Sequence, residues 1–333
     1  MKLASLRHGR DGRLVVVSRD LKTAAAVPAI ANTLQQALDD WSETEPRLQA
    51  VYDALNRGEQ ADAFTLDLAA VGAPLPRAYQ YLDGAAYVSH ISRNRAARGE
   101  SVPDDLHEKP LVYQGISHGF LGWNEDIRLP SEAHGIDFEG EIAAVTDAIP
   151  LGASSAEAAA RIRLFVLLND VSLRALIPPE LKRTFGFLTG KPASGLGPIA
   201  VTPDELGELW DGRFIWGRLR CQVGERVVGE LETGIGSPFD YGDLIAHVGQ
   251  TRAMEPGTLV GLGTVSNEDE SAGCACLGEL RAVETLRDGA AKTPLLKFGD
   301  RVRIEHFDRE GNSVFGPIDQ RIMPYQPQPS QGS

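Results

Sequence analysis

Short apolar or alternating stretches, each bounded by turn residues, dominate the chain beyond residue 110. They predict β-strands separated by turns, as in PLVYQGI, RLRCQV, RVVGELE, GTLVGLGTV and RVRIEHF. Apolar residues at helical spacing are rarer, and the segments that show them are 27–41, 48–55, 154–163, 202–210 and 240–254. The pattern therefore predicts a mainly β protein of the α+β class.

The N-terminal part has a pattern of its own. Residues 1–18 read as a β-hairpin that turns around Gly9–Gly12, and the two helical segments of residues 27–55 follow it. Two prolines in VGAPLPRAYQYLD, residues 71–83, indicate a junction. We therefore expect three parts: a small N-terminal α+β domain (1–75), a larger domain (76–323) and a Pro/Gln/Ser-rich disordered tail (324–333).

Composition narrows the class of protein. The 333 residues include 46 Asp and Glu but only 33 Lys and Arg, a net charge of −13. Nucleic acid and anionic membranes attract basic surfaces, so neither partner is expected. No apolar run approaches the about 18 residues of a membrane span, and the start MKLASLRHGRDGRLVVV places charges where an export signal needs apolar residues. With only three cysteines, the sequence favours a cytoplasmic protein.

The segment GIDFEGEIAAV, residues 135–145, carries the strongest chemical signal. On a β-strand alternate residues share a face, so Asp137, Glu139 and Glu141 would form a row of three acids. Like charges on one face repel each other. Two interpretations are open at this point: a fully solvated acidic edge strand, or a face that binds a cation.

Two further segments bring more acids and a histidine. LFVLLNDVSLR, residues 164–174, is an apolar run that ends at Asp170, and an acid at the end of a buried strand is costly unless it is paired or metal-bound. YLDGAAYVSH places Asp83 in a turn-like segment, with His90 seven residues later. A set of carboxylates suits Mg²⁺, Mn²⁺ or Ca²⁺. The Cys274–Cys276 pair lacks a second pair nearby, so a zinc site is not expected.

The motifs LDGAAYVSH, DFEGE, NDVSLR, FLTGK and GLGTVSN occur in an order and spacing that resemble the fumarylacetoacetate hydrolase superfamily. The resemblance covers roughly residues 80–320, and the first 75 residues resemble the small N-terminal domain of its longer members. It implies a catalytic core of the fumarylacetoacetase type, a mixed β-roll or β-sandwich. It also implies a homodimer.

The resemblance further implies one divalent cation (Mg²⁺, Mn²⁺ or Ca²⁺) held by four carboxylates, which here would be Asp83, Glu139, Glu141 and Asp170. Asp137 is expected to support this site from beside it. The catalytic residues that the resemblance implies are His90 and its partner Glu279 for activating water, with Lys191 and Arg174 for holding a carboxylate or an oxyanion. Expected substrate contacts are Arg98, Tyr87 and Thr264.

The sequence departs from true fumarylacetoacetases where the distal end of the substrate would bind. Those enzymes have a Gln and a Tyr after the Asn-Asp motif, whereas ALIPPELKRTFG, residues 175–186, has Ile177 near the Gln position and no Tyr. Ala85 stands where another Tyr is expected. These differences leave the acyl group of the substrate open.

Taken together, the residues and the resemblance predict an enzyme that hydrolyses a carbon–carbon bond of a small 1,3-diketo acid. Fumarylacetoacetate or an acylpyruvate from aromatic catabolism, such as tyrosine degradation, would be the substrate. An alternative on the same fold is a decarboxylase, hydratase or isomerase of 2-oxo acids. A non-catalytic metal- or ligand-binding protein is a third reading, and an acidic structural protein, whose DFEGE strand would be exposed and indifferent to metal, is a fourth.

Overall fold

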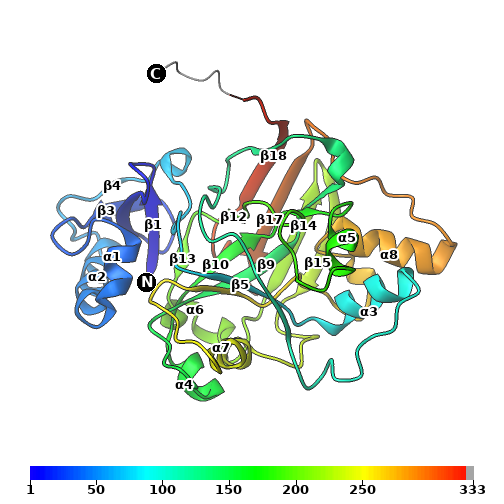
Figure 1. The fold of residues 1–333 in the computed structure, drawn as a ribbon. Helices are drawn as coiled ribbons and strands as arrows, with labels where there is room; N and C mark the ends of the chain where they lie inside the picture. Colours follow the sequence, from blue (N-terminus) through cyan, green and yellow to red (C-terminus); the bar gives the residue numbers. More distant parts are fainter. Residues whose placement is uncertain (328–333) are drawn as a thin grey trace, which may run out of the picture.

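The computed structural model describes residues 1–327, and one large mixed sheet forms its centre (Figure 1). The strands of this eleven-stranded sheet are β1 (Lys2–Leu6), β2 (Arg13–Val17), β3 (Thr23–Ala26), β4 (Phe64–Thr65), β5 (Tyr81–Ala85), β6 (Leu111–Gln114), β9 (Gly140–Thr146), β10 (Ile162–Asn169), β12 (Gly195–Leu196), β13 (Ala200–Val201) and β16 (Leu259–Gly261). Their order is β4-β3-β2-β1-β13-β10-β9-β16-β5-β6, and β12 pairs with β10 beside this path.

A second sheet covers one face of the core. Its five strands are β7 (Ile127–Leu129), β14 (Arg218–Val223), β15 (Arg226–Glu232), β17 (Arg301–Phe307) and β18 (Ile318–Pro324), in the order β15-β14-β17-β18-β7. A small two-stranded sheet joins β8 (Ile136–Asp137) to β11 (Ser172–Leu173). The predicted class, mainly β within α+β, is confirmed.

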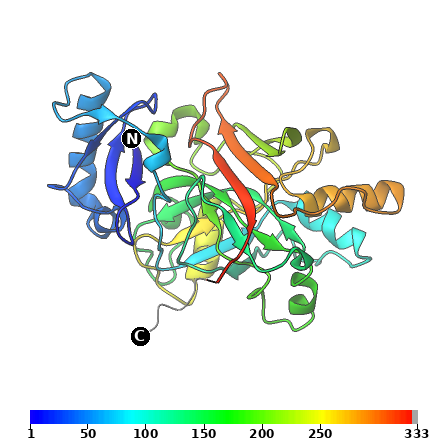
Figure 2. The same cartoon turned by 90° about the horizontal axis from the view of Figure 1, so that it is seen from above.

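The helices lie around the sheets. They are α1 (Leu34–Asp39), α2 (Trp41–Asn56), α3 (Val88–Ala97), α4 (Ser155–Ala159), α5 (Ile177–Leu181), α6 (Pro203–Leu206), α7 (Tyr241–Gly249) and α8 (Leu277–Asp288). Figures 1 and 2 place α1 and α2 at one end of the molecule, while α3 and α8 lie side by side at the other. Within residues 1–327, no helix has the length and apolar character needed to cross a bilayer.

The N-terminal segment extends the central sheet. Strand β1 pairs with β2 as the predicted hairpin, and its other edge pairs with β13, where Leu3 lies opposite Ala200. The helix predicted from residue 27 is only partly correct, because residues 27–33 form turns and helix α1 begins only after its N-cap, Thr33. Of the tail expected to be disordered, Pro324 ends β18, and residues 328–333 lie outside the described part.

Three other predicted helices are shorter than expected. Residues 154–163 form only α4, because the buried run that starts at Ile162 continues as strand β10. Residues 202–210 form α6 and a turn of 3-10 helix, and residues 240–254 form α7 up to Gly249. Helices α3, α5 and α8 were not predicted, and two of them carry candidate site residues.

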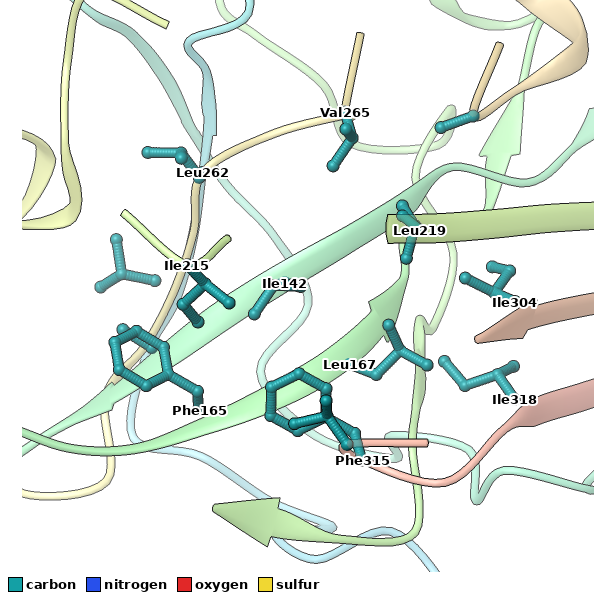
Figure 3. Packing of buried hydrophobic residues seen from close by; sticks show 14 of the residues in the cluster. Ile142, Phe165, Leu167, Ile215, Leu219, Leu262, Val265, Ile304, Phe315 and Ile318 are labelled. Carbon is teal, nitrogen blue, oxygen red and sulfur yellow. The ribbon is translucent and has the colours of Figure 1, made fainter. Parts of the chain in front are cut away.

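The main core lies between the two large sheets (Figure 3). Ile142 on β9 and Leu167 on β10 face Leu219 on β14, with Ile304 and Ile318 of the same five-stranded sheet close by. All five side chains are buried. The two layers therefore pack as a sandwich, and the polar end of β9 and β10 emerges at one edge of it.

Replacing Phe165 with alanine should lower the free energy of unfolding by about 3–5 kcal/mol, because a large buried cavity would be left. Its ring is fully buried and lies 4.8 Å from the ring of Trp210 and 5.2 Å from that of Tyr241. Denaturant unfolding measures the change, with Phe185→Ala as the control because Phe185 is 99% exposed. A cost below about 1 kcal/mol for Phe165→Ala would contradict this packing.

Burial of His306 should make the fold sensitive to acid. Its burial lowers the pKa of His306 to about 3, so between its ordinary pKa of about 6.5 and this value only the unfolded chain takes up the proton. Stability attributable to this residue therefore falls as the pH drops, by about 2 kcal/mol between pH 7 and pH 5. Denaturant unfolding of His306→Gln should lack this component, whereas exposed His107→Gln should retain it. Equal pH slopes for wild type and His306→Gln would contradict the prediction.

Candidate active site

A cavity of about 540 Å³ opens between α3, α8, strands β5 and β6 and the segment after α5. Its walls include most of the residues predicted from the sequence: Asp83, His90, Arg98, Glu139, Arg174, Lys191 and Thr264. Glu141, Asp170 and Glu279 lie directly behind this wall, through contacts described below. The fold therefore brings together motifs that are almost 200 residues apart in the chain.

Three buried carboxylates meet at one end of the cavity. Asp83 lies on β5, Glu141 on β9, and Asp170 follows the last residue of β10. Oxygen atoms from the three side chains all lie within 4.8 Å of one another. Strand β16 makes this approach possible, because a Cβ on Gly261 would lie 2.1 Å from Asp83 Oδ1. Asp83 was expected in a turn, and it lies within a strand instead.

These three acids fit a hard divalent cation. Asp83 Oδ1 and Glu141 Oε2 are buried and have no hydrogen-bond partner among the described residues. Burial, followed by the nearby Asp170, raises the pKa of Asp83 well above its ordinary value. The pKa of Glu141 is raised in the same way, by burial and then by Asp83 and Asp170. A bound cation would give these carboxylate oxygens a partner and would reduce the repulsion between the three acids. Ligands that are all oxygen atoms suit Mg²⁺, Mn²⁺ or Ca²⁺.

The fourth predicted ligand, Glu139, faces two cations. Its Oε1 accepts a hydrogen bond from Arg174 Nη2 at 2.7 Å, and its Oε2 accepts one from Lys191 Nζ at 2.6 Å. Although burial acts in the opposite direction, these two cations hold the pKa of Glu139 below its ordinary value. The prediction that the three acids form a row on one strand is wrong, because β8 ends at Asp137 and β9 begins only at Gly140.

Lys191 and Arg174 connect the acids to the rest of the site. Lys191 donates to Asp170 Oδ2 and to Ser172 Oγ in addition to Glu139. Arg174 donates through Nε to Asp137 Oδ2 at 2.7 Å. Asp137 also accepts the backbone N–H groups of residues 277 and 278, so this buried carboxylate anchors the start of helix α8. Its position matches the supporting role expected for it.

His90 and Glu279 form a hydrogen-bonded pair across the α3–α8 interface. His90 Nδ1 lies 2.9 Å from Glu279 Oε2, and Glu279 Oε1 accepts hydrogen bonds from Arg93 and Ser266. Burial alone would raise the pKa of Glu279, but the hydrogen bond with His90, together with those from Ser266 and Arg93, lowers it. An ionised Glu279 accepts the Nδ1–H of His90, which leaves Nε2 as an acceptor, 3.4 Å from Asn94 Nδ2 and 4.0 Å from Glu139 Oε1.

The structure places the three expected substrate contacts differently. Thr264 lines the cavity, and its hydroxyl donates to Glu141 Oε1 at 3.4 Å. Arg98 also lines it but pairs with Glu100 at 2.8 Å. Tyr87 is buried outside the lining, and its hydroxyl donates to the carbonyl of Thr233 at 2.7 Å. The structure therefore removes Tyr87 from the expected contacts.

Sequence reasoning missed four polar residues that support the site. Tyr113 Oη donates to Asp170 Oδ2 at 2.7 Å, and Ser194 donates to its Oδ1 at 2.9 Å. Arg93 and Ser266 hold Glu279, as described above. Arg93 lies one helical turn after His90, so a predicted helix at residues 88–97 would have indicated it. Tyr113 carried no local signal, because only the β5–β6 pairing brings it to the acids.

Two family models together span nearly the whole chain. Residues 80–323 match "Fumarylacetoacetate (FAA) hydrolase C-terminal", and residues 1–77 match "Fumarylacetoacetase N-terminal domain 2". The chain belongs to the fumarylacetoacetate hydrolase family. This family includes both hydrolases and isomerases, so membership establishes an enzyme fold of this type without selecting one reaction.

Curated relatives of this fumarylacetoacetate hydrolase family member are distant. The human mitochondrial oxaloacetate tautomerase FAHD2B is 26% identical over 184 residues, which span only about half (54%) of each chain. A 2,4-didehydro-3-deoxy-L-rhamnonate hydrolase from Sphingomonas sp. (strain SKA58) is 26% identical over 62% of this chain and 69% of that protein.

Solved structures of similar fold cover 98% of this chain and 100% of each matched chain. One is a putative HpcE protein from Mycobacterium smegmatis, with a TM-score of 0.67 and 20% identity. Another is a maleylpyruvate hydrolase from Sphingobium sp. SYK-6, in complex with manganese(II) ion and pyruvate, with a TM-score of 0.65 and 16% identity. At these identities the likeness establishes the fold.

Replacing Lys191 with methionine should lower the free energy of unfolding of the metal-free protein by about 3–5 kcal/mol, because two buried carboxylates would lose their shared cation. Lys191 is 7% exposed and contacts both Glu139 and Asp170. Lys109→Met is the control, since the Lys109–Asp105 pair is exposed and should contribute at most about 1 kcal/mol. Equal losses for the two variants in denaturant unfolding would contradict the buried ion pairs.

Proposed function

We propose that this protein is a metal-dependent hydrolase that cleaves a carbon–carbon bond of a 1,3-diketo acid such as fumarylacetoacetate or an acylpyruvate. The observation that supports this proposal is the His90–Glu279 pair at the same cavity as the three carboxylates. A hydrolase needs both a base that activates water and a group that polarises the substrate. The His90–Glu279 pair would supply the base, and the three carboxylates would hold the cation that polarises the substrate.

Asp83, Glu141 and Asp170 would hold one divalent cation, Mg²⁺, Mn²⁺ or Ca²⁺. When bound, such a cation polarises the carbonyl oxygens of a diketo acid. Glu139 stays beside this site and keeps Lys191 and Arg174 in place through its two hydrogen bonds.

The protein residues then have separate tasks. Glu279 holds the Nδ1–H of His90, so that Nε2 takes a proton from water and hydroxide attacks the acyl carbonyl carbon. Lys191 and Arg174 stabilise the negative charge that develops on the carbonyl oxygen. The bond between this carbon and the methylene carbon breaks, its electron pair stays on the methylene carbon, and His90 returns the proton there. The products are a carboxylic acid and an oxo acid, which is a 2-oxo acid from an acylpyruvate and a 3-oxo acid from fumarylacetoacetate.

The runner-up is a tautomerase, isomerase, decarboxylase or hydratase of a 2-oxo acid on the same fold. It is favoured by the relatives named as oxaloacetate tautomerases, and it uses the metal-binding acids without needing a base that drives hydrolysis of a carbon–carbon bond. Incubation with oxaloacetate separates the two proposals, because only this second one predicts a metal-dependent change of oxaloacetate.

The decisive experiment follows the loss of diketone ultraviolet absorbance with fumarylacetoacetate and a set of acylpyruvates. The protein is assayed after treatment with a chelator and again after Mg²⁺ or Mn²⁺ is restored. Loss of absorbance that requires the added metal, with the carboxylic acid and the oxo acid formed in equal amounts, supports the hydrolase. No loss with any diketo acid, despite measurable metal binding, would overturn it in favour of the 2-oxo-acid chemistry.

A further inference from the structure

The cavity is rich in cations although the chain as a whole is acidic. Its walls contain Arg95, Arg98, Arg174, Lys191 and Arg281. Arg174 and Lys191 are paired with buried acids, and Arg98 is paired with Glu100. The charges of these three are therefore already balanced by the protein.

Arg281 differs from these three residues. It is half-buried on α8, and its guanidinium donates to the backbone carbonyl of Thr293. In the described part of the chain it forms no ion pair with a carboxylate. Arg95 on α3 is similar, since its guanidinium donates to the carbonyl of Ser101 at 3.0 Å, but it is more exposed. Most N–H groups of Arg281 therefore remain free to bind an anion inside the cavity.

The position of Arg281 follows from the face of α8 that lines the cavity. Gly278, Arg281, Ala282 and Thr285 all line it, and spacings of three and four residues place them along one side of the helix. Gly278 abuts the catalytic end, because a Cβ there would lie 2.7 Å from Arg174 Nε. Arg281 lies one turn, about 4.5 Å along the helix axis, farther from the acids.

The walls of the cavity that Arg281 lines are largely apolar. Apolar side chains from several other segments line the same cavity: Ile91, Leu111, Ile177, Leu181, Phe187 and Leu295. An apolar surrounding strengthens the attraction between a guanidinium and a carboxylate, and the planar fork of arginine can bind both carboxylate oxygens. The cavity therefore offers an apolar channel with Arg281 as a cation that no carboxylate of the described residues balances, and its hydrogen bond is more buried than that of Arg95.

We infer that Arg281 binds a second carboxylate at the acyl end of the substrate, so that dicarboxylic diketo acids are preferred over monocarboxylic ones of equal length. This inference rests on the proposed function, because it concerns the acyl group of the same diketo acid. It gives this role to Arg281 and not to Arg98, an expected substrate contact whose guanidinium pairs with Glu100 at 2.8 Å.

The test compares 2,4-dioxoheptanedioate with 2,4-dioxoheptanoate, which have the same chain length and differ only in the terminal carboxylate. Wild-type protein with Mn²⁺ should show a higher kcat/KM for the dicarboxylate. Arg281→Gln should reduce the ratio of the two kcat/KM values about 10- to 100-fold and leave the value for the monocarboxylate nearly unchanged. Arg281→Lys should restore part of the ratio, because it keeps the charge without the planar fork.

Arg287→Gln is the matched control, because Arg287 lies on the same helix but is exposed and pairs with Asp288 at 3.0 Å. It should leave the ratio unchanged. An unchanged ratio in Arg281→Gln would overturn the inference. The inference would also be overturned if Arg98→Gln lowered the ratio of the two kcat/KM values and Arg281→Gln did not.

A binding measurement separates this inference from the proposed function. Isothermal titration of the Mn²⁺-loaded protein with succinate and with butyrate requires no turnover. Succinate should bind more tightly than butyrate in wild type, and Arg281→Gln should weaken succinate binding about tenfold. If neither diketo acid is cleaved, the hydrolase proposal fails, and the succinate titration still decides the role of Arg281: equal affinities in wild type and variant would overturn it.

Discussion

Replacing His90 with alanine should lower kcat for a cleaved diketo acid by about 100- to 10,000-fold, because the group that takes the proton from water would be lost. The affinity for Mn²⁺ should stay nearly intact, since Asp83, Glu141 and Asp170 come from β5, β9 and the end of β10 rather than from α3. The measurements are steady-state kinetics on the diketo acid and calorimetric titration with Mn²⁺.

The partner of His90 gives a graded version of the same test. Glu279→Gln keeps the size of the side chain, but an uncharged amide no longer stabilises a protonated His90, so a smaller fall in kcat is expected. His107→Ala is the control, because His107 is exposed and lies outside the cavity lining. Undiminished turnover in His90→Ala would remove this histidine from the mechanism.

How far the sequence predicts this site depends on which elements carry it. Glu141 lies in the buried strand β9 and Asp170 directly follows the buried strand β10, and in both places a charged residue interrupts an apolar run that is visible in the sequence. The hairpin of β1 and β2 could also be predicted, because two short strands and the turn between them are adjacent in the sequence. Apolar runs therefore indicated the strands that carry or precede Glu141 and Asp170, whereas Asp83 was expected in a turn although it lies in β5.

The helical part of the site was less visible. In VSHISRNRAA most residues are polar, so the apolar period that marks a helix is weak, and α3 is stabilised by its packing against α8. The same packing joins His90 to Glu279, so their pairing was suggested by family resemblance and not by residue pattern. Arg93 remained hidden because its role depends on the helix.

The contacts of Glu139 could not be read from strand alternation. Alternation assumes one continuous strand, but the chain leaves β8 after Asp137 and enters β9 at Gly140, and this break turns Glu139 toward Lys191 and Arg174. Its charge is balanced by side chains more than 30 residues away in sequence. Long-range ion pairs of this kind leave no periodic signal.

Replacing Glu141 with glutamine should have opposite effects on function and on the stability of the metal-free protein. Three mutually repelling, buried carboxylates meet without a hydrogen-bond partner for Asp83 Oδ1 or Glu141 Oε2, so removing one charge should stabilise the metal-free fold by about 1–3 kcal/mol. Thermal unfolding in the presence of a chelator measures this gain. The same variant loses a ligand oxygen and should bind Mn²⁺ at least about tenfold more weakly.

Metal-dependent stabilisation then connects the two effects. A cation that binds only the folded protein stabilises it by RT ln(1 + [L]/Kd), so wild type at 100 times Kd should gain about 2.7 kcal/mol. At the same Mn²⁺ concentration Glu141→Gln should gain much less, and its turnover should fall with its metal occupancy. Ser154→Ala, far from these acids at the start of α4, should change neither the Mn²⁺ affinity nor the gain. If wild type and Glu141→Gln gained equally from Mn²⁺, the cation would have to bind elsewhere, because within residues 1–327 Glu141 is one of only three acids whose oxygens converge at this end of the cavity.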